Sequence, residues 1–177
     1  DRAQSLYLKL KAHLGSDVLL LLFHARFPAD QRSEQERTVL ASFGQQGERP
    51  ARALLVATQV AEQSLDIDFD FMITDLAPVD LILQRAGRLH RHTRERPEAH
   101  RQAVLHVAGL DPRGLPDLKT TAWEYVYDPY ILGRTWALLS REHELHLPQD
   151  IDRLVQAVYD GQDLPADLSE ADRARIE

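Results

Sequence analysis

The chain has 177 residues, of which 44% are hydrophobic and 28% charged, and its 21 Lys and Arg against 28 Asp and Glu give a net charge of −7. This is the composition of an ordinary globular protein, which excludes disordered, collagen-like and coiled-coil chains. The sequence has no cysteine for disulfides or thiolate metal sites, and no apolar run near the roughly 20 residues of a membrane span. We therefore expect a cytoplasmic protein without a membrane partner.

Short apolar runs alternate with helical patterns over the first 110 residues. Helices are predicted at residues 5–14, at 30–43 with Asp30 as N-cap, and from Pro78 toward Arg88. Strands are predicted at residues 18–23, 53–57, 69–74 and 103–108. This order predicts an α/β fold with a mostly parallel sheet and helices on both faces, in which ligands gather at the carboxyl ends of the strands.

The pattern changes after residue 109. Turn-forming residues follow, and then two amphipathic helices are predicted at residues 129–140 and 148–159, with a weakly ordered acidic end. We therefore predict three parts, which are an α/β lobe over residues 1–110, a linker over 111–128 and a helical extension with an acidic tail over 129–177. The tail carries most of the negative charge, because residues 141–177 hold ten acidic and four basic residues.

One candidate site follows the second predicted strand. Thr58 stands where that strand gives way to a short helix, and free backbone N–H groups at a helix start, together with a hydroxyl, make an anion site. Thr58 and Asp66 are equally well explained as helix N-caps. The residues alone leave both interpretations open.

The second candidate is a basic island over residues 85–101, with six Arg, two Glu and three His. Arg85, Arg88 and Arg91 recur every three residues, which places them on one helical face or on a tight turn, and Gly87 allows a close approach of the backbone. Converging guanidinium groups suit an anion such as a γ-phosphate, although a solvated helix end is the alternative. The His residues lie among positive charges without cysteine, so we predict no metal site.

These stretches resemble a known family. Motif V of superfamily 2 helicases resembles VATQVAEQSLDIDFD, motif VI resembles APVDLILQRAGRLHRH, and the motif IV region resembles HARFPADQRSEQERTVLASFG, which starts at His24. Gln59, Gln63 and Ser64 depart from the general motif V. The sequence pattern TQxxEQSLDID followed by QRxGRLHRH is similar to that of the CRISPR-associated helicase-nuclease of type I systems. The resemblance implies that residues 1–110 are the second RecA-like lobe of such a motor.

The resemblance also implies roles in ATP hydrolysis. Arg88 and Arg91 match the motif VI arginines that reach the γ-phosphate, and Gln84 matches the glutamine that contacts the same triphosphate. Asp66 matches the aspartate near the ATP ribose or the finger arginine. Gln63 is expected among the nucleotide contacts.

Arg85 has two possible roles. It is either a third phosphate contact or the partner of Asp66 or Asp80 in an internal ion pair.

The remaining matched residues are expected to contact nucleic acid. Thr58 matches the threonine that contacts the backbone of the tracked strand, and Gln59 follows it. His24 and Arg26 lie at the end of the first predicted strand, where this lobe faces nucleic acid or the cleft.

Two parts of an NTPase are absent from the sequence, since neither GxxxxGK[ST] nor a DExD/H box occurs. The resemblance therefore implies a longer parent protein, in which a missing first lobe binds most of the ATP and Mg²⁺. We predict that the chain alone has no ATPase activity. In the intact protein, lobe closure would move single-stranded DNA toward an HD nuclease domain, in partnership with a CRISPR RNA-guided surveillance complex.

Three alternatives remain open from the sequence. The chain is a lobe of another superfamily 2 helicase acting on DNA or RNA, a non-catalytic nucleic-acid-binding module that uses the basic island, or a protein-interaction domain docked through its acidic tail. The feature that separates a motor from a binding surface is the paired placement of Asp66 and Arg88, which a binding surface does not need.

Overall fold

The chain forms two compact units. The computed structural model describes residues 2–24, 28–59, 65–111, 113–121, 123–161 and 163–176, without the side chains of residues 29 and 30. Unit 1 comprises Asp1–Asp70 and His90–Arg96, and unit 2 comprises Phe71–Leu89 and Pro97–Glu177. Two predicted site residues, Arg26 and Gln63, lie outside the described ranges.

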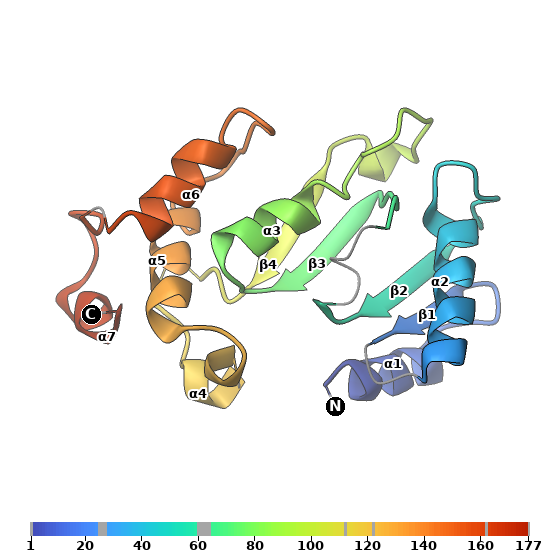
Figure 1. Ribbon diagram of the computed structural model, residues 1–177, viewed down its shortest axis with the longest axis horizontal. Helices are drawn as coiled ribbons and strands as arrows, with labels where there is room; N and C mark the ends of the chain where they lie inside the picture. Colours follow the sequence, from blue (N-terminus) through green and yellow to red (C-terminus); the bar gives the residue numbers. More distant parts are fainter. Residues whose placement is uncertain are drawn as a thin grey trace. The chain divides into compact units, whose positions relative to one another are not determined.

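Unit 1 is built on a parallel pair of strands (Figure 1). Its elements are α1 (Arg2–His13), β1 (Leu19–Phe23), α2 (Ala29–Phe43) and β2 (Ala53–Ala57). The strands pair from Leu19 beside Ala53 to Phe23 beside Ala57. Parallel neighbours need a crossover connection, and α2 provides it.

One face of this strand pair packs against α2. Side chains alternate along a strand, so Leu21 and Phe23 of β1 share a face, and both contact the cluster that includes Val39 and Phe43 of α2. Each such side chain contributes about 1.5–3 kcal/mol when fully buried. Helix α1 contacts both strands.

The segment after residue 64 is fastened to the end of α2. Gly44 donates its N–H to the Leu40 carbonyl at 2.8 Å and forms an isolated antiparallel bridge with Ile67, which is fully buried. The N–H of Asp68 donates to the Phe43 carbonyl at 2.9 Å. These contacts give residues 65–68 a fixed support.

Unit 2 holds a second parallel strand pair and the helical extension. Its elements are β3 (Phe71–Asp75), α3 (Val79–Ala86), the 3₁₀ helix η2 (Glu98–His100), β4 (Val104–Ala108), α4 (Leu118–Thr121), the 3₁₀ helix η3 (Trp123–Tyr125), α5 (Pro129–Leu139), α6 (Ile151–Tyr159) and α7 (Glu170–Ile176). The strands pair from Phe71 beside Val104 to Asp75 beside Ala108. The predicted α/β class with parallel strands is therefore confirmed.

The core of unit 2 joins β4 to the helices. Leu105 packs against a cluster that includes Ile82 of α3, Leu139 of α5, and Leu154 and Val158 of α6.

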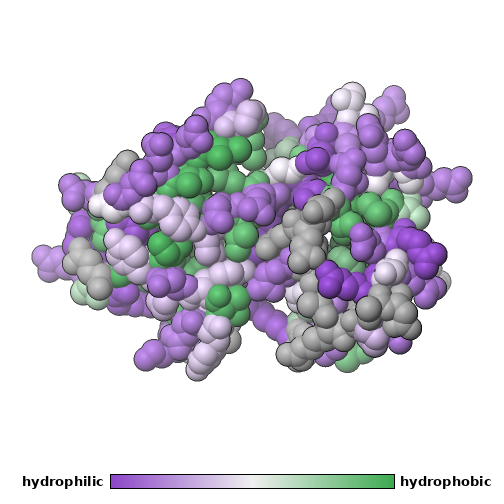
Figure 2. All heavy atoms as spheres, in the orientation of Figure 1, coloured by the Kyte–Doolittle hydropathy of each residue, from purple (hydrophilic) through white to green (hydrophobic). Residues whose placement is uncertain are grey.

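Apolar side chains also reach the surface, and Figure 2 shows green patches among the hydrophilic residues on the face that it draws.

The segment predicted as a linker has structure of its own. It contains α4 and η3, and its side chains Leu115, Leu118 and Trp123 belong to a buried cluster together with Trp136 of α5. The end of the chain also differs from the expectation of weak order, because α7 forms there and buries Ile176 in the same cluster. Both segments fold because apolar side chains are spaced among their turn-forming residues. Composition alone does not show that these side chains become buried. The proposed domain boundaries stay a prediction.

The start of α2 also differs from the prediction. The helix begins at Ala29, and Pro28 occupies the N-cap position without a side-chain hydrogen bond. Asp30 is therefore inside the first turn, and its prediction as N-cap is wrong.

Candidate functional site

Three predicted nucleic-acid contacts stand at the carboxyl ends of the strands of unit 1. Thr58 follows β2 directly, and its N–H donates to the Phe23 carbonyl at the end of β1, at 3.1 Å. His24 follows β1, is only 4% exposed, and lies 3.3 Å from the Nε2 atom of Gln4. Gln59 is exposed and Thr58 is half-buried. The structure thus brings Thr58 and His24 to one edge but presents their side chains differently.

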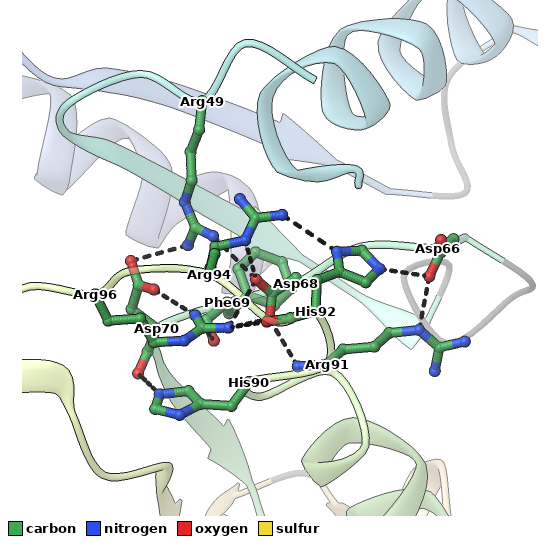
Figure 3. A network of polar contacts seen from close by, with 10 residues as sticks. All are labelled: Arg49, Asp66, Asp68, Phe69, Asp70, His90, Arg91, His92, Arg94 and Arg96. Carbon is green, nitrogen blue, oxygen red and sulfur yellow. Dashed lines mark hydrogen bonds and ion pairs between the residues drawn. The ribbon is translucent and has the colours of Figure 1, made fainter. Parts of the chain in front are cut away.

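Motifs V and VI meet at Asp66 (Figure 3). The Nε atom of Arg91 donates to Asp66 Oδ1 at 2.6 Å, and Nε2 of His92 lies 2.9 Å from the same oxygen. The side chains of Asp66 and Arg91 are 51% and 45% exposed. Asp66 also lines an open pocket of about 390 Å³ beside the end of α2, with residues 40, 41 and 44–47.

The two terminal guanidinium nitrogens of Arg91 are available to a ligand. Within the described residues, its side chain is bonded only through Nε, and its two terminal nitrogens have no hydrogen-bond or ion-pair partner. Figure 3 shows these nitrogens at the far side of the guanidinium from Asp66. Two parallel N–H donors on a guanidinium match two oxygens of a phosphate. The geometry therefore leaves Arg91 able to bind an anion while Asp66 holds it.

A second carboxylate, Asp68, is fully buried among arginines. It forms ion pairs with Arg49 at 3.1 Å, Arg94 at 2.9 Å and Arg96 at 3.0 Å. Its Oδ1 atom also accepts the backbone N–H of Arg91 at 2.8 Å. The charges that surround this carboxylate compensate the large cost of burying it.

Asp70 extends the same network. It pairs with Arg49 at 2.9 Å and with Arg96 at 2.5 Å, and Arg96 also donates to the His92 carbonyl at 2.9 Å. The chain turns into this network at His90, which has a φ of 50° and donates its N–H to the Phe69 carbonyl at 3.1 Å. All ten residues of Figure 3 belong to unit 1.

The network changes the acidity of its carboxyl groups. The hydrogen bond from His92, followed by that from Arg91, lowers the pKa of Asp66 below its ordinary value of 3.8. Burial raises the pKa of Asp68, but the hydrogen bond and charge of Arg96 and the N–H of Arg91 outweigh burial, and the net shift is downward. Both groups are therefore ionised at neutral pH.

The other predicted motif VI residues belong to unit 2. Gln84 is exposed on α3, and Arg88 is half-buried directly after this helix, with its N–H donated to the Arg85 carbonyl at 2.9 Å. Gln84, Arg85 and Arg88 thus belong to a different unit from Asp66 and Arg91. The observed partners of Asp66 are Arg91 and His92.

Arg85 joins α3 to two other segments. Its guanidinium donates to the Thr74 hydroxyl at 2.7 Å, the Asp75 carbonyl at 3.2 Å and the Tyr127 hydroxyl at 3.2 Å. Asp80, proposed as an alternative partner, accepts a hydrogen bond from Tyr159 at 2.7 Å. These contacts connect α3 to β3 and to Tyr127 within unit 2. A contact of Arg85 with a nucleotide stays a prediction.

Most of the network is not among the predicted site residues. Arg94 and Arg96 lie in the predicted basic island, yet their charges are directed inward to Asp68 and Asp70, and Arg96 is only 6% exposed. The signal was present in the alternating carboxylates of the motif DIDFD, which places Asp66, Asp68 and Asp70 two residues apart. Arg49 is remote in sequence from both motifs and carries no such signal.

Two further observations concern the described residues alone. Over these ranges, His, Asp and Glu side chains nowhere gather in threes as they would around a metal ion. No helix in the same ranges combines the length and the apolar character that crossing a membrane requires.

Comparison with known proteins identifies the family. Residues 1–94 match the family described as "CRISPR-associated nuclease/helicase Cas3, C-terminal". The chain belongs to this family. The predicted resemblance is thereby confirmed, and the alternative of another superfamily 2 helicase is not supported.

Relatives of the Cas3 family match nearly the whole chain. A CRISPR-associated endonuclease/helicase Cas3 of Thermus thermophilus is 49% identical over 162 residues, which are 92% of this chain and 17% of that relative. The crystal structure of T. fusca Cas3-ADP matches with a TM-score of 0.84 and 42% identity, over 99% of this chain and 21% of that one. This likeness confirms the predicted RecA-like α/β fold.

A third match comes from an assembly. A chain in the structure of a CRISPR RNA-guided surveillance complex, pre-nicking, matches with a TM-score of 0.76 and 41% identity, over 99% of this chain and 22% of that one. The chain thus spans about a fifth of the length of these Cas3 relatives.

Proposed function

We propose that this chain is the second motor lobe of an ATP-dependent single-stranded DNA translocase and helicase in CRISPR antiviral defence. The observation that carries the proposal is the Asp66–Arg91 pair, which joins motif V to motif VI at 2.6 Å and leaves the terminal nitrogens of Arg91 unpaired among the described residues. A surface that only binds nucleic acid does not need an aspartate to orient one of its arginines. The inward pairing of Arg94 and Arg96 also reduces the charge that a simple binding surface would display.

In this function the chain completes a nucleotide site that a first lobe, outside these 177 residues, provides for ATP and Mg²⁺. ATP supplies the phosphoryl group whose transfer to water drives the motor. Arg91 and Arg88 offset the negative charge that spreads over that group, since positive charge from across a cleft stabilises the transition state. Gln84 and Arg85 contact the triphosphate, Gln63 joins the nucleotide contacts, and Asp66 orients Arg91 beside the ribose.

The same lobe grips DNA at the carboxyl ends of β1 and β2. Thr58 and Gln59 contact the phosphate backbone of the tracked strand, because a hydroxyl and an exposed amide there can donate to phosphate oxygens. His24 is buried beside Gln4, so it shapes this edge more readily than it contacts DNA. Arg26 is proposed as a further contact.

The partners follow from the family. The name of the Thermus relative includes endonuclease/helicase, and another match lies in an RNA-guided surveillance complex. We extend the endonuclease/helicase activity and the partnership with a surveillance complex to the parent protein of this chain. That protein then delivers single-stranded DNA to an HD nuclease domain in the cytoplasm. The chain alone is expected to lack ATPase activity because the phosphate loop and the DExD/H box lie elsewhere.

The test is Arg91→Ala in the full-length protein. We expect kcat for ATP hydrolysis to fall about 10³-fold, the scale of arginine fingers, with little change in the KM for ATP. Arg113→Ala is the matched control, because Arg113 is 88% exposed and its ion pair within the described part of the chain is with the nearby Asp111. Unchanged turnover in the Arg91 variant would contradict the proposal, and a raised KM with normal kcat would make Arg91 a ground-state contact only.

A further inference from the structure

Asp68 is the centre of the network but belongs to none of the predicted contacts. Its side chain is fully buried, and four groups meet its two oxygens. Arg49 and Arg96 donate hydrogen bonds through their guanidinium groups, and Arg94 adds an ion pair at 2.9 Å without a hydrogen bond. The fourth group is the backbone N–H of Arg91, which donates to Oδ1. A buried carboxylate with this set of donors is held in one orientation, since each oxygen has its partners.

The fourth contact links Asp68 to Arg91. The backbone of Arg91 is held by Asp68 Oδ1 at 2.8 Å, and its side chain is held by Asp66 Oδ1 at 2.6 Å. Two carboxylates two residues apart thus hold the backbone N–H and the Nε atom of the same arginine. A side chain restrained at its backbone and at Nε loses most of its freedom before any ligand arrives, which lowers the entropy cost of using it.

The support of Asp68 is itself rigid. Its own N–H is bonded to the Phe43 carbonyl, and the preceding Ile67 is fully buried against Gly44. On the other side, Arg96 bonds to both oxygens of Asp68 at 3.0 Å and to the His92 carbonyl at 2.9 Å. The segment that carries Arg91 is therefore connected to the end of α2 through one carboxylate.

We propose that Asp68 is a positioning residue for Arg91, which holds its backbone so that the guanidinium is presented in one place. This inference rests on the proposed function of Arg91 as a finger to the γ-phosphate. Asp68 touches no nucleotide in this role and acts through Arg91 alone. Its loss is expected to misplace the finger without removing it.

Asp70 supplies a matched control. It shares Arg49 and Arg96 with Asp68, but its side chain has no contact with Arg91. Asp70→Asn therefore removes comparable ion pairs from the same network and leaves the Arg91 N–H bonded. In Asp68→Asn, one oxygen replaces two, and three arginines compete with the Arg91 N–H for it.

The experiment compares both variants in the full-length protein. We expect Asp68→Asn to lower kcat for ATP hydrolysis by about 10²-fold, the scale of a finger displaced by about 1 Å, with little change in the KM for ATP. Asp70→Asn is expected to keep kcat nearly at the wild-type value although its melting temperature falls. Hydrogen exchange of the Arg91 amide should accelerate in the Asp68 variant and stay slow in the Asp70 variant.

A double-mutant cycle shows whether Asp68 acts through Arg91. If it does, Asp68→Asn together with Arg91→Ala has the kcat of Arg91→Ala alone, within about twofold. Multiplied losses, or equal losses in the Asp68 and Asp70 variants, would overturn the positioning role. If Asp68→Asn does not fold, Asp68→Glu retains the charge and displaces the carboxylate, and wild-type kcat in that variant would equally overturn it.

The failure of the two proposals can be told apart. If Arg91→Ala has normal turnover, the finger role is lost, whatever the Asp68 variants do. If Arg91→Ala is impaired while Asp68→Asn turns over normally, the finger role stands and the positioning role is refuted.

Discussion

Asp66 accepts a hydrogen bond from Nε of Arg91 at 2.6 Å although 25 residues separate them in the chain. The same oxygen receives Nε2 of His92 at 2.9 Å. A carboxylate that orients a guanidinium through Nε leaves the two terminal nitrogens directed outward, as Figure 3 shows. This relationship connects the two motifs that the sequence identifies separately, and it supports a finger role more strongly than either motif alone.

The first prediction concerns the acidity of Asp66. Because its pKa is lowered from 3.8, the folded chain binds this proton less tightly than the unfolded chain does. The interaction therefore stabilises the fold above pH 3.8 and loses its contribution as the pH falls through the lowered pKa. Carboxyl NMR titration should place the midpoint of Asp66 below 3.8.

Two variants separate the causes of that shift. His92→Ala should raise the pKa of Asp66 toward 3.8 more than Arg91→Ala does, because the hydrogen bond from His92 is the larger cause. Arg113→Ala, which removes the pair with Asp111 in unit 2, should leave the titration of Asp66 unchanged. A midpoint at 3.8 in the unaltered protein would show that the pair does not persist in solution.

A second prediction contrasts two glycines. A Cβ at Gly44 would lie 2.5 Å from the Leu40 carbonyl oxygen, so Gly44→Ala should destabilise the fold by about 1–3 kcal/mol. At Gly87 the nearest atoms to a Cβ are at 3.5 and 3.6 Å, and φ is −64°. Gly87→Ala should therefore stabilise the fold by about 0.4–1 kcal/mol. Denaturant unfolding of both variants measures the difference.

The Gly87 variant also tests the sequence interpretation of this residue. Its predicted close approach to another backbone finds no counterpart among the described residues, where a Cβ has ordinary room. If Gly87→Ala is stable but lowers ATPase activity of the full-length protein, the glycine is needed for the approach of a nucleotide or another lobe. Normal activity would make Gly87 replaceable.

Sequence periodicity located the strands well, and its limits have physical causes. β2 coincides with its predicted range, and β1, β3 and β4 lie within two residues of theirs, because short apolar runs between turn formers are typical of strands. Trp123 and Leu118 lie in the predicted linker because turn formers surround them in the sequence. Their burial depends on contacts with Trp136, which local patterns do not contain.

The sequence predicts only those site residues whose roles follow from a recognisable motif. Asp66 and Arg91 were identified as partners of a nucleotide, but their mutual bond and the role of Asp68 depend on folding. An arginine in a basic run has the same sequence signal whether it faces phosphate or a buried carboxylate. Arg96 is of the second kind, since Asp68 and Asp70 lie beside it.

A third prediction concerns the turn into the network. His90 has a φ of 50°, a left-handed conformation that asparagine tolerates and β-branched residues avoid. His90→Asn should therefore keep the melting temperature close to that of the wild type. His90→Val should destabilise the fold by about 1–3 kcal/mol, measured by denaturant unfolding. Equal stability of the two variants would show that this backbone conformation is not maintained.

The last prediction concerns the helical extension. Arg134 of α5 is 5% exposed and donates to the Val158 and Ala157 carbonyls at the end of α6, at 2.9 and 2.8 Å. Those carbonyls lie in the last turn of α6, where helical carbonyls run out of N–H partners, so a guanidinium there satisfies them and complements the helix dipole. Arg134→Leu should cost about 2 kcal/mol or more, because hydrogen bonds to charged groups contribute about 1.5–3 kcal/mol each.

Arg153 of α6 provides the matched control. It is 50% exposed and pairs with Glu142 and Asp150, so Arg153→Leu should cost about 1 kcal/mol or less. Limited proteolysis of the full-length protein should cut near α6 faster in the Arg134 variant than in the Arg153 variant. The same rate in both would mean that Arg134 does not fasten α6 to α5, and apolar contacts such as those of Leu139 with Leu154 and Val158 would then hold the two helices together.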